Sequence, residues 1–416
     1  MDITVERSFL KGTVRAPASK SVMIRVLAAG LLSRGETLVR FPGTCDDVLA
    51  ARQVIRSLGA DVTESENEWF IKGGISLRED VLDVGESGLT ARLFTPLAAL
   101  LSQPMTITGK GSLMKRPMDM MIKPLQQLGV KVKSNRGCLP VTVHGPVQGG
   151  NIRMDGSRSS QFLTGLLMSL PLAEKDSIIR VDNLKSVPYI DLTIRVMGQF
   201  GISCKHSNYK RFFIPGNQEY QATETGIEGD WSGAAFLLAA AAIAGDLKVT
   251  GLDPKSCQAD RKILEALGEA GVETEVTPEY VHVRQSDIHP FTFDITHCPD
   301  LAPPLVGLAV FARGKTVIRG ISRLYEKESN RALTLQEEAG KLGVKIDLEG
   351  DTMAIHGGRI TGGESDAHQD HRIAMAAAIM ALKADKPVTI HGTECVSKSY
   401  PGFFDDLKKL GGNIYE

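Results

Sequence analysis

The chain has 416 residues, of which 42% are hydrophobic and 23% charged, a composition typical of a globular protein with two or three domains. The formal net charge of −1 argues against a nucleic-acid binder that relies on overall charge, although a local basic site is compatible with it. The six cysteines are scattered, the N-terminus lacks a hydrophobic signal region, and the longest apolar run, 231–245, is too short to span a membrane. We therefore expect reduced thiols and a cytoplasmic protein.

A short sequence segment that is expected to end a helix and to begin an extended strand recurs six times along the chain. At its first occurrence, residues 57–62, Gly59 stops the helix, because glycine takes a positive φ without steric cost. The equivalent glycines stand at positions 59, 129, 201, 271, 343 and 411, at intervals of 70, 72, 70, 72 and 68 residues. This spacing predicts six small αβ units.

Each unit also contains a helix with a polar start and a body that is apolar on nearly every side, which indicates a buried helix. The polar starts are 19–21, 86–88, 159–161, 230–232, 299–300 and 370–371. Segments between helices, such as 37–41, 177–181 and 316–319, alternate like strands with one exposed face. The sequence therefore predicts buried helices covered by half-exposed sheets.

The six units divide as three plus three at the polar stretch 219–229. The strand before Ser19 is expected to cross over to the second half. We therefore predict one discontinuous domain of residues 1–18 and 229–416, and another of residues 19–228. The hinge is expected near 17–20 and 226–230.

Basic residues gather at or near the polar helix starts. The first turn of a helix carries about half a positive charge, so a cation there is disfavoured unless an anion binds. Lys20, Arg25, Arg92 and Arg372 lie in the first two turns of such helices. If the helices point one way within each half, their N-termini open on a cleft that attracts anions.

Eight motifs in chain order carry a resemblance to a known family. They are PASKSVMIR (17–25), LMKRPM (113–118), SSQF (159–162), SVPYI (186–190), PDL (299–301), KESNR (327–331), DHRIAM (370–375) and SKSYP (397–401). Together they resemble the 5-enolpyruvylshikimate-3-phosphate synthase family, the 3-phosphoshikimate 1-carboxyvinyltransferases.

The resemblance implies an α/β fold of two inside-out domains, each of three βαβαββ-like repeats, that close over the substrates. It implies transfer of the enolpyruvyl group of phosphoenolpyruvate to the 5-hydroxyl of shikimate 3-phosphate, with release of phosphate, in aromatic amino-acid biosynthesis. It also implies a monomer that needs no metal or organic cofactor.

The resemblance assigns three catalytic residues: Asp300 as the base on the hydroxyl, and Lys20 and Glu328 as proton carriers on the phosphoenolpyruvate side. For shikimate 3-phosphate it implies Lys20, Ser21, Arg25, Ser159, Ser160, Gln161, Ser186, Tyr189, Asp300, Arg323 and Lys327. For phosphoenolpyruvate it implies Lys20, Gly88, Arg116, Gln161, Arg331, Arg372 and Lys398. Plain helix capping is the alternative for Asp300, Ser159 and Ser160, and a core position is the alternative for Tyr189.

The chain departs from the family pattern at five positions. Glu86 stands for an asparagine, Leu89 for a threonine, Arg323 for an asparagine or histidine, Asn330 for an aspartate and Trp231 for a small residue. None of these removes a catalytic group. Because Gly88 is retained, the resemblance implies inhibition by glyphosate at the phosphoenolpyruvate site, with Leu89 as the departure that puts it in doubt.

Two other functions are weighed against this one. The sister enzyme that transfers enolpyruvate to UDP-N-acetylglucosamine usually has a cysteine in the loop equivalent to 111–118, and this chain has none there. A catalytically inactive anion-binding homologue is disfavoured by Asp300, Glu328 and Lys20. No metal is expected, because His368 and His371 lack a third ligand nearby.

Overall fold

A computed structural model describes residues 1–416 and divides them into two compact units. The first unit comprises Met1–Pro17 and Glu228–Glu416, and the second comprises Ala18–Ile227. No helix in either unit is both long and apolar enough to cross a membrane.

The second unit contains three four-stranded sheets of one plan, with the orders β16-β4-β6-β5, β7-β8-β10-β9 and β11-β12-β14-β13. In each, the first two strands are parallel and the remaining pairs are antiparallel. A short parallel pair, β3 and β15, completes the unit. The bounds are β3 Ser33–Arg34, β4 Glu36–Arg40, β5 Asp61–Glu64, β6 Glu68–Lys72, β7 Val81–Asp83, β8 Pro104–Thr108, β9 Lys131–Asn135, β10 Cys138–His144, β11 Asn151–Asp155, β12 Ser177–Asp182, β13 Lys205–Ser207, β14 Arg211–Ile214, β15 Tyr220–Gln221 and β16 Glu224–Gly226.

The first unit repeats the plan, with the orders β18-β19-β17-β2, β20-β21-β23-β22 and β24-β25-β1-β26. Strands β1 and β2 come from the N-terminus, so the segment before Ser19 belongs to the sheets of this unit. The bounds are β1 Asp2–Val5, β2 Leu10–Arg15, β17 Gly245–Thr250, β18 Thr274–Val276, β19 Tyr280–Arg284, β20 Thr292–Asp294, β21 Lys315–Arg319, β22 Ile346–Glu349, β23 Thr352–His356, β24 Gly363–Asp366, β25 Val388–His391 and β26 Ile414–Tyr415.

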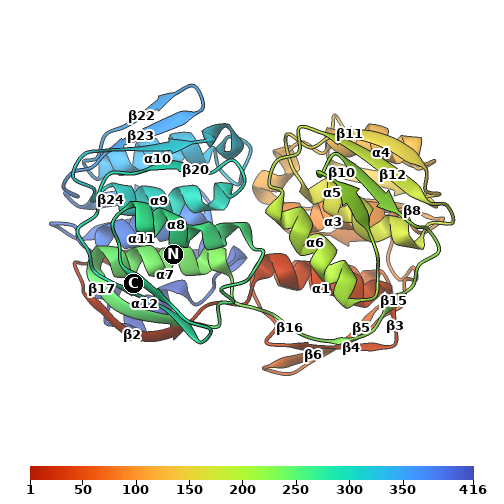
Figure 1. Cartoon of the computed structure of the whole chain (residues 1–416), viewed down its shortest axis with the longest axis horizontal. Helices are drawn as coiled ribbons and strands as arrows, with labels where there is room; N and C mark the ends of the chain where they lie inside the picture. Colours follow the sequence, from red (N-terminus) through yellow and green to blue (C-terminus); the bar gives the residue numbers. More distant parts are fainter. The chain divides into compact units, whose positions relative to one another are not determined.

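One helix of each repeat is buried, as its apolar body predicts. These helices are α1 Lys20–Leu32, α3 Gly88–Ala98 and α5 Gln161–Ser169 in the second unit, and α7 Trp231–Ala244, α9 Ala302–Ala309 and α11 His371–Ala381 in the first. Every residue of α7 and α11 is buried. The helices pack on one another within each unit, and Figure 1 shows β4, β5 and β6 on the outside of α1. The predicted inside-out α/β fold is confirmed.

The second helix of each repeat is amphipathic or short and ends at the recurring glycine. These helices are α2 Asp46–Ser57, α4 Ile122–Gln127, α6 Pro188–Gln199, α8 Ile263–Glu269, α10 Arg331–Lys341 and α12 Phe403–Lys409. All six glycines adopt positive φ, between 77° and 113°, as predicted for a helix stop.

Short 3-10 turns lie beside several helix starts. They are η1 Gly111–Lys115, η2 Asp119–Met121, η3 Leu170–Leu172, η4 Ala259–Lys262, η5 Pro299–Leu301, η6 Ile321–Leu324 and η7 Thr393–Lys398. The predicted helix start at 299–300 is corrected by η5, because α9 begins only at Ala302. Pro303 and Pro304, which lack an N–H, occupy the first turn of α9, where that group has no helical partner.

Candidate active site

In the second unit, Lys20 opens helix α1 beside a carboxylate. Ser19 caps the helix by accepting a hydrogen bond from the Val22 N–H at 3.4 Å. The Lys20 Nζ lies 3.0 Å from the Asp47 Oδ2, and both side chains are largely buried. Asp47 therefore holds the predicted proton carrier at the helix start, where the helix dipole alone would disfavour a cation.

Arg25 lies one turn further along α1 and is only 1% exposed. Its guanidinium donates to the Ser21 carbonyl at 2.7 Å and the Tyr189 carbonyl at 3.2 Å. It also donates to the Thr193 and Thr164 hydroxyls at 2.9 and 3.4 Å. The structure thus brings Arg25, Ser21 and Tyr189 together across α1, α5 and α6, three of the residues expected to bind shikimate 3-phosphate.

Two guanidiniums lie against Gly88 at the first position of α3. A Cβ placed on Gly88 would lie 2.8 Å from the Arg116 Nη1 and 3.0 Å from the Arg92 Nη1. Arg92 also donates to the Gln161 Oε1 at 2.9 Å and to the Pro117 carbonyl at 3.0 Å. Gly88, Arg116 and Gln161, all expected at the phosphoenolpyruvate site, therefore form one cationic group that also contains Arg92.

The serines and the tyrosine of the predicted site lie around α5 and α6. Ser159 accepts a hydrogen bond from the Gln161 N–H at 3.2 Å, while Ser160 holds the N-cap position of α5 without a side-chain capping bond. Ser186 is buried with a φ of 54°, a backbone conformation uncommon outside glycine. Tyr189 is half-buried, so it does not occupy the fully buried core position that was the alternative for this residue.

In the first unit, Arg331 at the start of α10 holds three carboxylates. Its Nε and Nη2 donate to the Asp370 carboxylate at 2.7 and 3.1 Å, a bidentate pair. The Nη2 also donates to the Glu328 Oε2 at 2.5 Å, and the Nη1 to the Asp300 Oδ1 at 2.8 Å. Arg331 and Asp370 are fully buried, whereas the side chains of Asp300 and Glu328 are 23% and 20% exposed, so Asp370 depends most on the guanidinium for compensation.

Asp300 receives cations from three directions. Besides Arg331, the Lys327 Nζ lies 3.3 Å from its Oδ1 and the Arg372 Nη2 lies 3.4 Å from its Oδ2. The helix-capping alternative for Asp300 is not observed, since Leu301 holds the N-cap position of α9. The structure therefore gathers Asp300, Lys327, Glu328, Arg331 and Arg372 into one cluster, as their expected common site requires.

The electrostatics of this cluster follow from burial and charge. Burial, assisted by Arg331 and Arg323, lowers the pKa of Lys327 against the opposing charges of Asp300 and Glu328. Burial also works against the charged form of Arg372, but the negative charges of Asp300, Asp260 and Asp230 together raise its pKa. The lysine thus loses its proton more readily than an exposed lysine, whereas the arginine remains a fixed positive charge.

Asp260 of η4 is a further carboxylate beside this cluster, and the sequence analysis did not select it. It is 2% exposed, and the Ser232 hydroxyl donates to its carboxylate. Burial and the charge of Asp300 raise the pKa of Asp260 to about 6. Only the fold reveals this proximity, because 40 residues separate Asp260 from Asp300.

Lys398 and the turn before α11 form the edge of the same group. The Lys398 Nζ donates to the Gln369 carbonyl at 2.8 Å. His368 and Gln369 both adopt positive φ, and Glu338 accepts from the Asp366 N–H at 2.8 Å and lies 2.7 Å from the His368 Nε2. Glu338 therefore holds the turn that leads to Asp370, the N-cap of α11.

Glu338 is also the centre of the one carboxylate–histidine group that could hold a metal ion, with Glu337 and His368. Their ligand atoms lie within 4.8 Å of one another. However, the Lys341 Nζ already lies 2.7 Å from the Glu338 Oε1 and 3.1 Å from the Glu337 Oε1. The lysine supplies the positive charge that a cation would bring.

The residues at the five departures from the family pattern lie in different structural environments. Asn330 caps α10 by accepting from the Leu333 N–H at 3.3 Å. The buried Trp231 donates through its indole N–H to the Asp253 carbonyl at 3.2 Å. Leu89 is buried in α3, the Glu86 carboxylate lies against Gly111, and the charge of Arg323 acts on Lys327.

Sequence reasoning missed several partners of the predicted residues. Asp47 and Asp260 lie outside the motifs, and Asp370 opens the DHRIAM motif without any sign that it pairs with Arg331. Arg92 did have a signal, since a cation stands near the start of a buried helix, but it was not included among the site residues. Thr164 lies within the apolar helix α5 and Thr193 on the buried face of the amphipathic helix α6, and neither residue gave a signal.

The comparisons with known proteins agree with this geometry over the whole chain. The family profile described as EPSP synthase (3-phosphoshikimate 1-carboxyvinyltransferase) matches residues 5–407. The chain belongs to the EPSP synthase family. Among curated EPSP synthase relatives, the 3-phosphoshikimate 1-carboxyvinyltransferase of Clostridium kluyveri is 38% identical, with 100% of this chain and 98% of the relative covered. That of Methanocorpusculum labreanum is 35% identical, with both chains fully covered.

Solved structures share the fold of this EPSP synthase family member. An EPSP synthase from Acinetobacter baumannii has a TM-score of 0.84 at 26% identity, with both chains fully covered. The enolpyruvyl transferase NikO from Streptomyces tendae has a TM-score of 0.82 at 16% identity, covering 100% of this chain and 98% of that chain. The second likeness concerns the fold alone.

Proposed function

We propose that Asp300 is the base of the reaction of this EPSP synthase family member. The reaction transfers the enolpyruvyl group of phosphoenolpyruvate to the 5-hydroxyl of shikimate 3-phosphate and releases phosphate. The observation that supports the assignment is the Asp300 carboxylate, which three cations surround at the start of a buried helix. These cations favour the ionised carboxylate, the form that can accept the hydroxyl proton.

We further propose that Lys20 and Glu328 carry protons to and from the methylene carbon of phosphoenolpyruvate. In the addition, the hydroxyl oxygen attacks the enol carbon that bears the phosphate, and the neighbouring methylene carbon gains a proton. In the elimination, that carbon returns the proton and inorganic phosphate leaves. Glu328 is supported by its hydrogen bond to Arg331, which fixes the carboxylate beside Asp300.

The arginines are proposed to hold the anionic groups of both substrates. A guanidinium binds two carboxylate or phosphate oxygens at once, and each charge-assisted hydrogen bond is worth roughly 1.5–3 kcal/mol. Shikimate 3-phosphate is assigned to Arg25 with its neighbours Ser21, Ser159, Ser160, Gln161, Ser186 and Tyr189, and to Lys20, Arg323 and Lys327. Phosphoenolpyruvate is assigned to Gly88, Arg116, Gln161, Arg331, Arg372, Lys398 and Lys20.

The decisive experiment measures phosphate release from phosphoenolpyruvate with shikimate 3-phosphate, with UDP-N-acetylglucosamine and without an acceptor. We expect release only with shikimate 3-phosphate. Asp300→Asn should reduce kcat by roughly a hundredfold or more, the usual contribution of a general base. Asp287→Asn is the matched control, because Asp287 pairs with Arg313 at the surface and both side chains are exposed.

Each other outcome changes a different part of the proposal. Release with UDP-N-acetylglucosamine would replace the acceptor and retain phosphoenolpyruvate as the donor. Full activity of Asp300→Asn would exclude Asp300 as the base and leave the overall reaction in place. No phosphate release under any of the three conditions would favour a catalytically inactive homologue.

We also propose that glyphosate competes with phosphoenolpyruvate at Gly88. The tight approach of Arg116 and Arg92 leaves no room for a side chain on Gly88 unless a guanidinium moves. Gly88→Ala should therefore weaken inhibition by glyphosate, and it should also raise KM for phosphoenolpyruvate because Arg116 is displaced. Wild-type activity that is unchanged under excess glyphosate and limiting phosphoenolpyruvate would refute this.

We also propose an oligomeric state and a compartment for the protein. The family resemblance supports a monomer, which analytical ultracentrifugation would test. The six cysteines form no disulfide in the structure, which favours a reducing compartment such as the cytoplasm, and cell fractionation would test this.

A further inference from the structure

A row of three arginines crosses the outer face of one sheet in the second unit. The parallel pairing of β11 with β12 places Arg153 opposite Arg180, and the antiparallel pairing of β12 with β14 places Arg180 opposite Arg211. All three side chains are exposed. Like charges directly opposite one another destabilise a sheet, so this row is unfavourable by itself.

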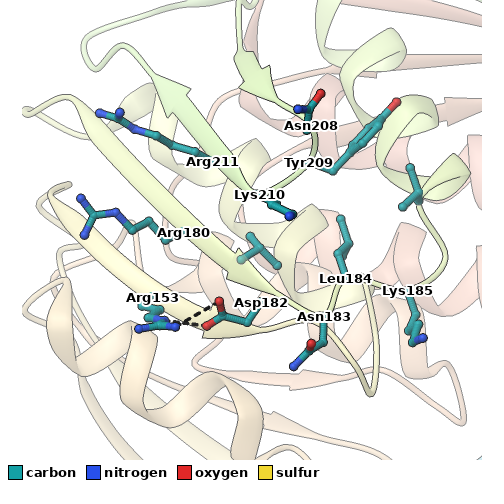
Figure 2. A pocket seen from close by; sticks show the side chains of 12 residues that line it. Arg153, Arg180, Asp182, Asn183, Leu184, Lys185, Asn208, Tyr209, Lys210 and Arg211 are labelled. Atoms are coloured by element: carbon teal, nitrogen blue, oxygen red, sulfur yellow. Dashed lines mark hydrogen bonds and ion pairs between the residues drawn. The ribbon is translucent and has the colours of Figure 1, made fainter.

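Only one end of the row is neutralised within the protein. Arg153 donates to the two Asp182 oxygens at 2.6 and 3.2 Å, the pair drawn with dashed lines in Figure 2. Arg180 and Arg211 make no side-chain hydrogen bond or ion pair within residues 1–416. Two adjacent guanidiniums therefore have their donors available.

The repeats of the chain supply an internal comparison for this position. Arg40 occupies in β4 the place that Arg180 occupies in β12, at the exposed end of the same buried–intermediate–buried–exposed pattern. The residue opposite Arg40 is Glu68, and Arg40 donates to Glu68 at 2.5 Å and to Glu224 at 2.6 Å. Carboxylates thus compensate the arginine in one repeat, whereas arginines flank it in the other.

The row lines an open pocket of about 760 Å³, and none of the predicted site residues of the unit is among the residues that line it. Two further cations, Lys185 and Lys210, line the same pocket, and Asp182 is its only acidic lining residue. In Figure 2 the three arginine side chains stand one above another along one side of the pocket, and Lys210 lies near its middle. Five cations therefore share one carboxylate in a chain whose net charge is −1.

We propose that this pocket binds a small anion that carries two or more phosphate groups. Neighbouring strands lie roughly 5 Å apart, so the row presents a series of positive charges that one phosphate group does not neutralise. Each guanidinium fork takes two phosphate oxygens. Arg180 and Arg211 are the principal contacts, because Asp182 already occupies Arg153. This site goes beyond the proposed function and does not depend on it.

The test is calorimetric titration with inorganic tripolyphosphate, pyrophosphate and orthophosphate in magnesium-free buffer. We expect affinity to rise in the order orthophosphate, pyrophosphate, tripolyphosphate, and to fall with added salt. The double variant Arg180→Gln/Arg211→Gln should bind tripolyphosphate about a hundredfold more weakly, roughly tenfold for each charge-assisted contact removed. Arg40→Gln, which alters the equivalent position of another repeat, should retain wild-type affinity.

A second readout shows whether the double variant is folded. Its rate of phosphate release without tripolyphosphate should equal that of the wild type. Its melting temperature should be no lower, because the variant removes repulsion between neighbours. Tripolyphosphate should raise the melting temperature of the wild type and not that of the variant.

Three results would overturn the proposal. The first is wild-type affinity for tripolyphosphate in the folded double variant. The second is loss of that affinity in Arg372→Ala, which would place the anion at the catalytic residues. The third is the absence of any tripolyphosphate binding to the wild-type protein at low salt.

Discussion

The buried carboxyl group of Asp260 should contribute less to the stability of the first unit at neutral pH than in acid. Asp260 is 2% exposed, and burial with the charge of Asp300 raises its pKa from 3.8 to about 6. Asn has the same shape without the charge, and its carbonyl can accept the same hydrogen bond from Ser232. We therefore expect Asp260→Asn to stabilise the first unit at neutral pH.

The sign and size follow from proton linkage. A carboxyl group whose pKa is higher in the folded state than in the unfolded state adds stability below the unfolded pKa and loses that contribution as the pH rises through the folded pKa. The interval from 3.8 to about 6 corresponds to about 3 kcal/mol. The variant should therefore match the wild type near pH 4 and exceed its stability by about 3 kcal/mol at pH 7.5.

The two tryptophans of the chain allow this unit to be followed separately. Trp231 belongs to the first unit and Trp69 to the second, and both are buried. In a Trp69→Phe background, urea unfolding followed by tryptophan fluorescence reports Trp231, which adjoins Ser232. Asp287→Asn is the control at an exposed carboxylate. The reasoning fails if Asp260→Asn is less stable than its background at pH 7.5, or if the difference does not change with pH.

Three further variants test the buried polar contacts. Arg331→Met leaves the buried Asp370 carboxylate without its bidentate partner and should cost about 3–5 kcal/mol in urea unfolding at pH 7. A free energy of unfolding equal to that of the wild type would contradict this. Burial opposes ionisation of Glu338, but the hydrogen bond from Lys341 and its other bonds lower its pKa. Glu338→Gln should thus cost about 1–3 kcal/mol in urea unfolding at pH 7 and little below pH 4, and a cost that persists in acid would count against it. Arg25→Lys keeps the positive charge but loses the planar guanidinium that reaches Thr193. The KM for shikimate 3-phosphate should therefore rise about tenfold with little change in kcat. An unaltered KM would contradict the assignment of Arg25 to the shikimate 3-phosphate site.

The repeating architecture could be predicted because its signals are local. A glycine with positive φ after an apolar helix face marks each helix end, and Gly59 and Gly411 adopt that conformation at opposite ends of the series. The buried helices could be predicted from local sequence as well, because a segment such as α7 has no polar face. Each of these predictions depends on only a few neighbouring residues in the sequence.

The pairing of distant side chains could not be predicted in this way. Arg153 and Arg180 face each other only because β11 and β12 pair in one particular register, and a shift by one residue would turn one side chain to the other face. The sequence predicts Asp370 at a helix start, but not its ion pair with Arg331, which lies 39 positions earlier. Such contacts depend on the packing of whole repeats.

The N-terminal strands impose an order on folding during synthesis. β1 leaves the ribosome well before its partners, because it pairs with β25 and β26 near the other end of the described residues. The second unit, Ala18–Ile227, is by contrast one continuous stretch, and all its strands are made before β17–β26 of the first unit. It can therefore fold before the first unit is complete. The hydrogen-bonding edges of β1 stay unpaired until β25 and β26 have been synthesised.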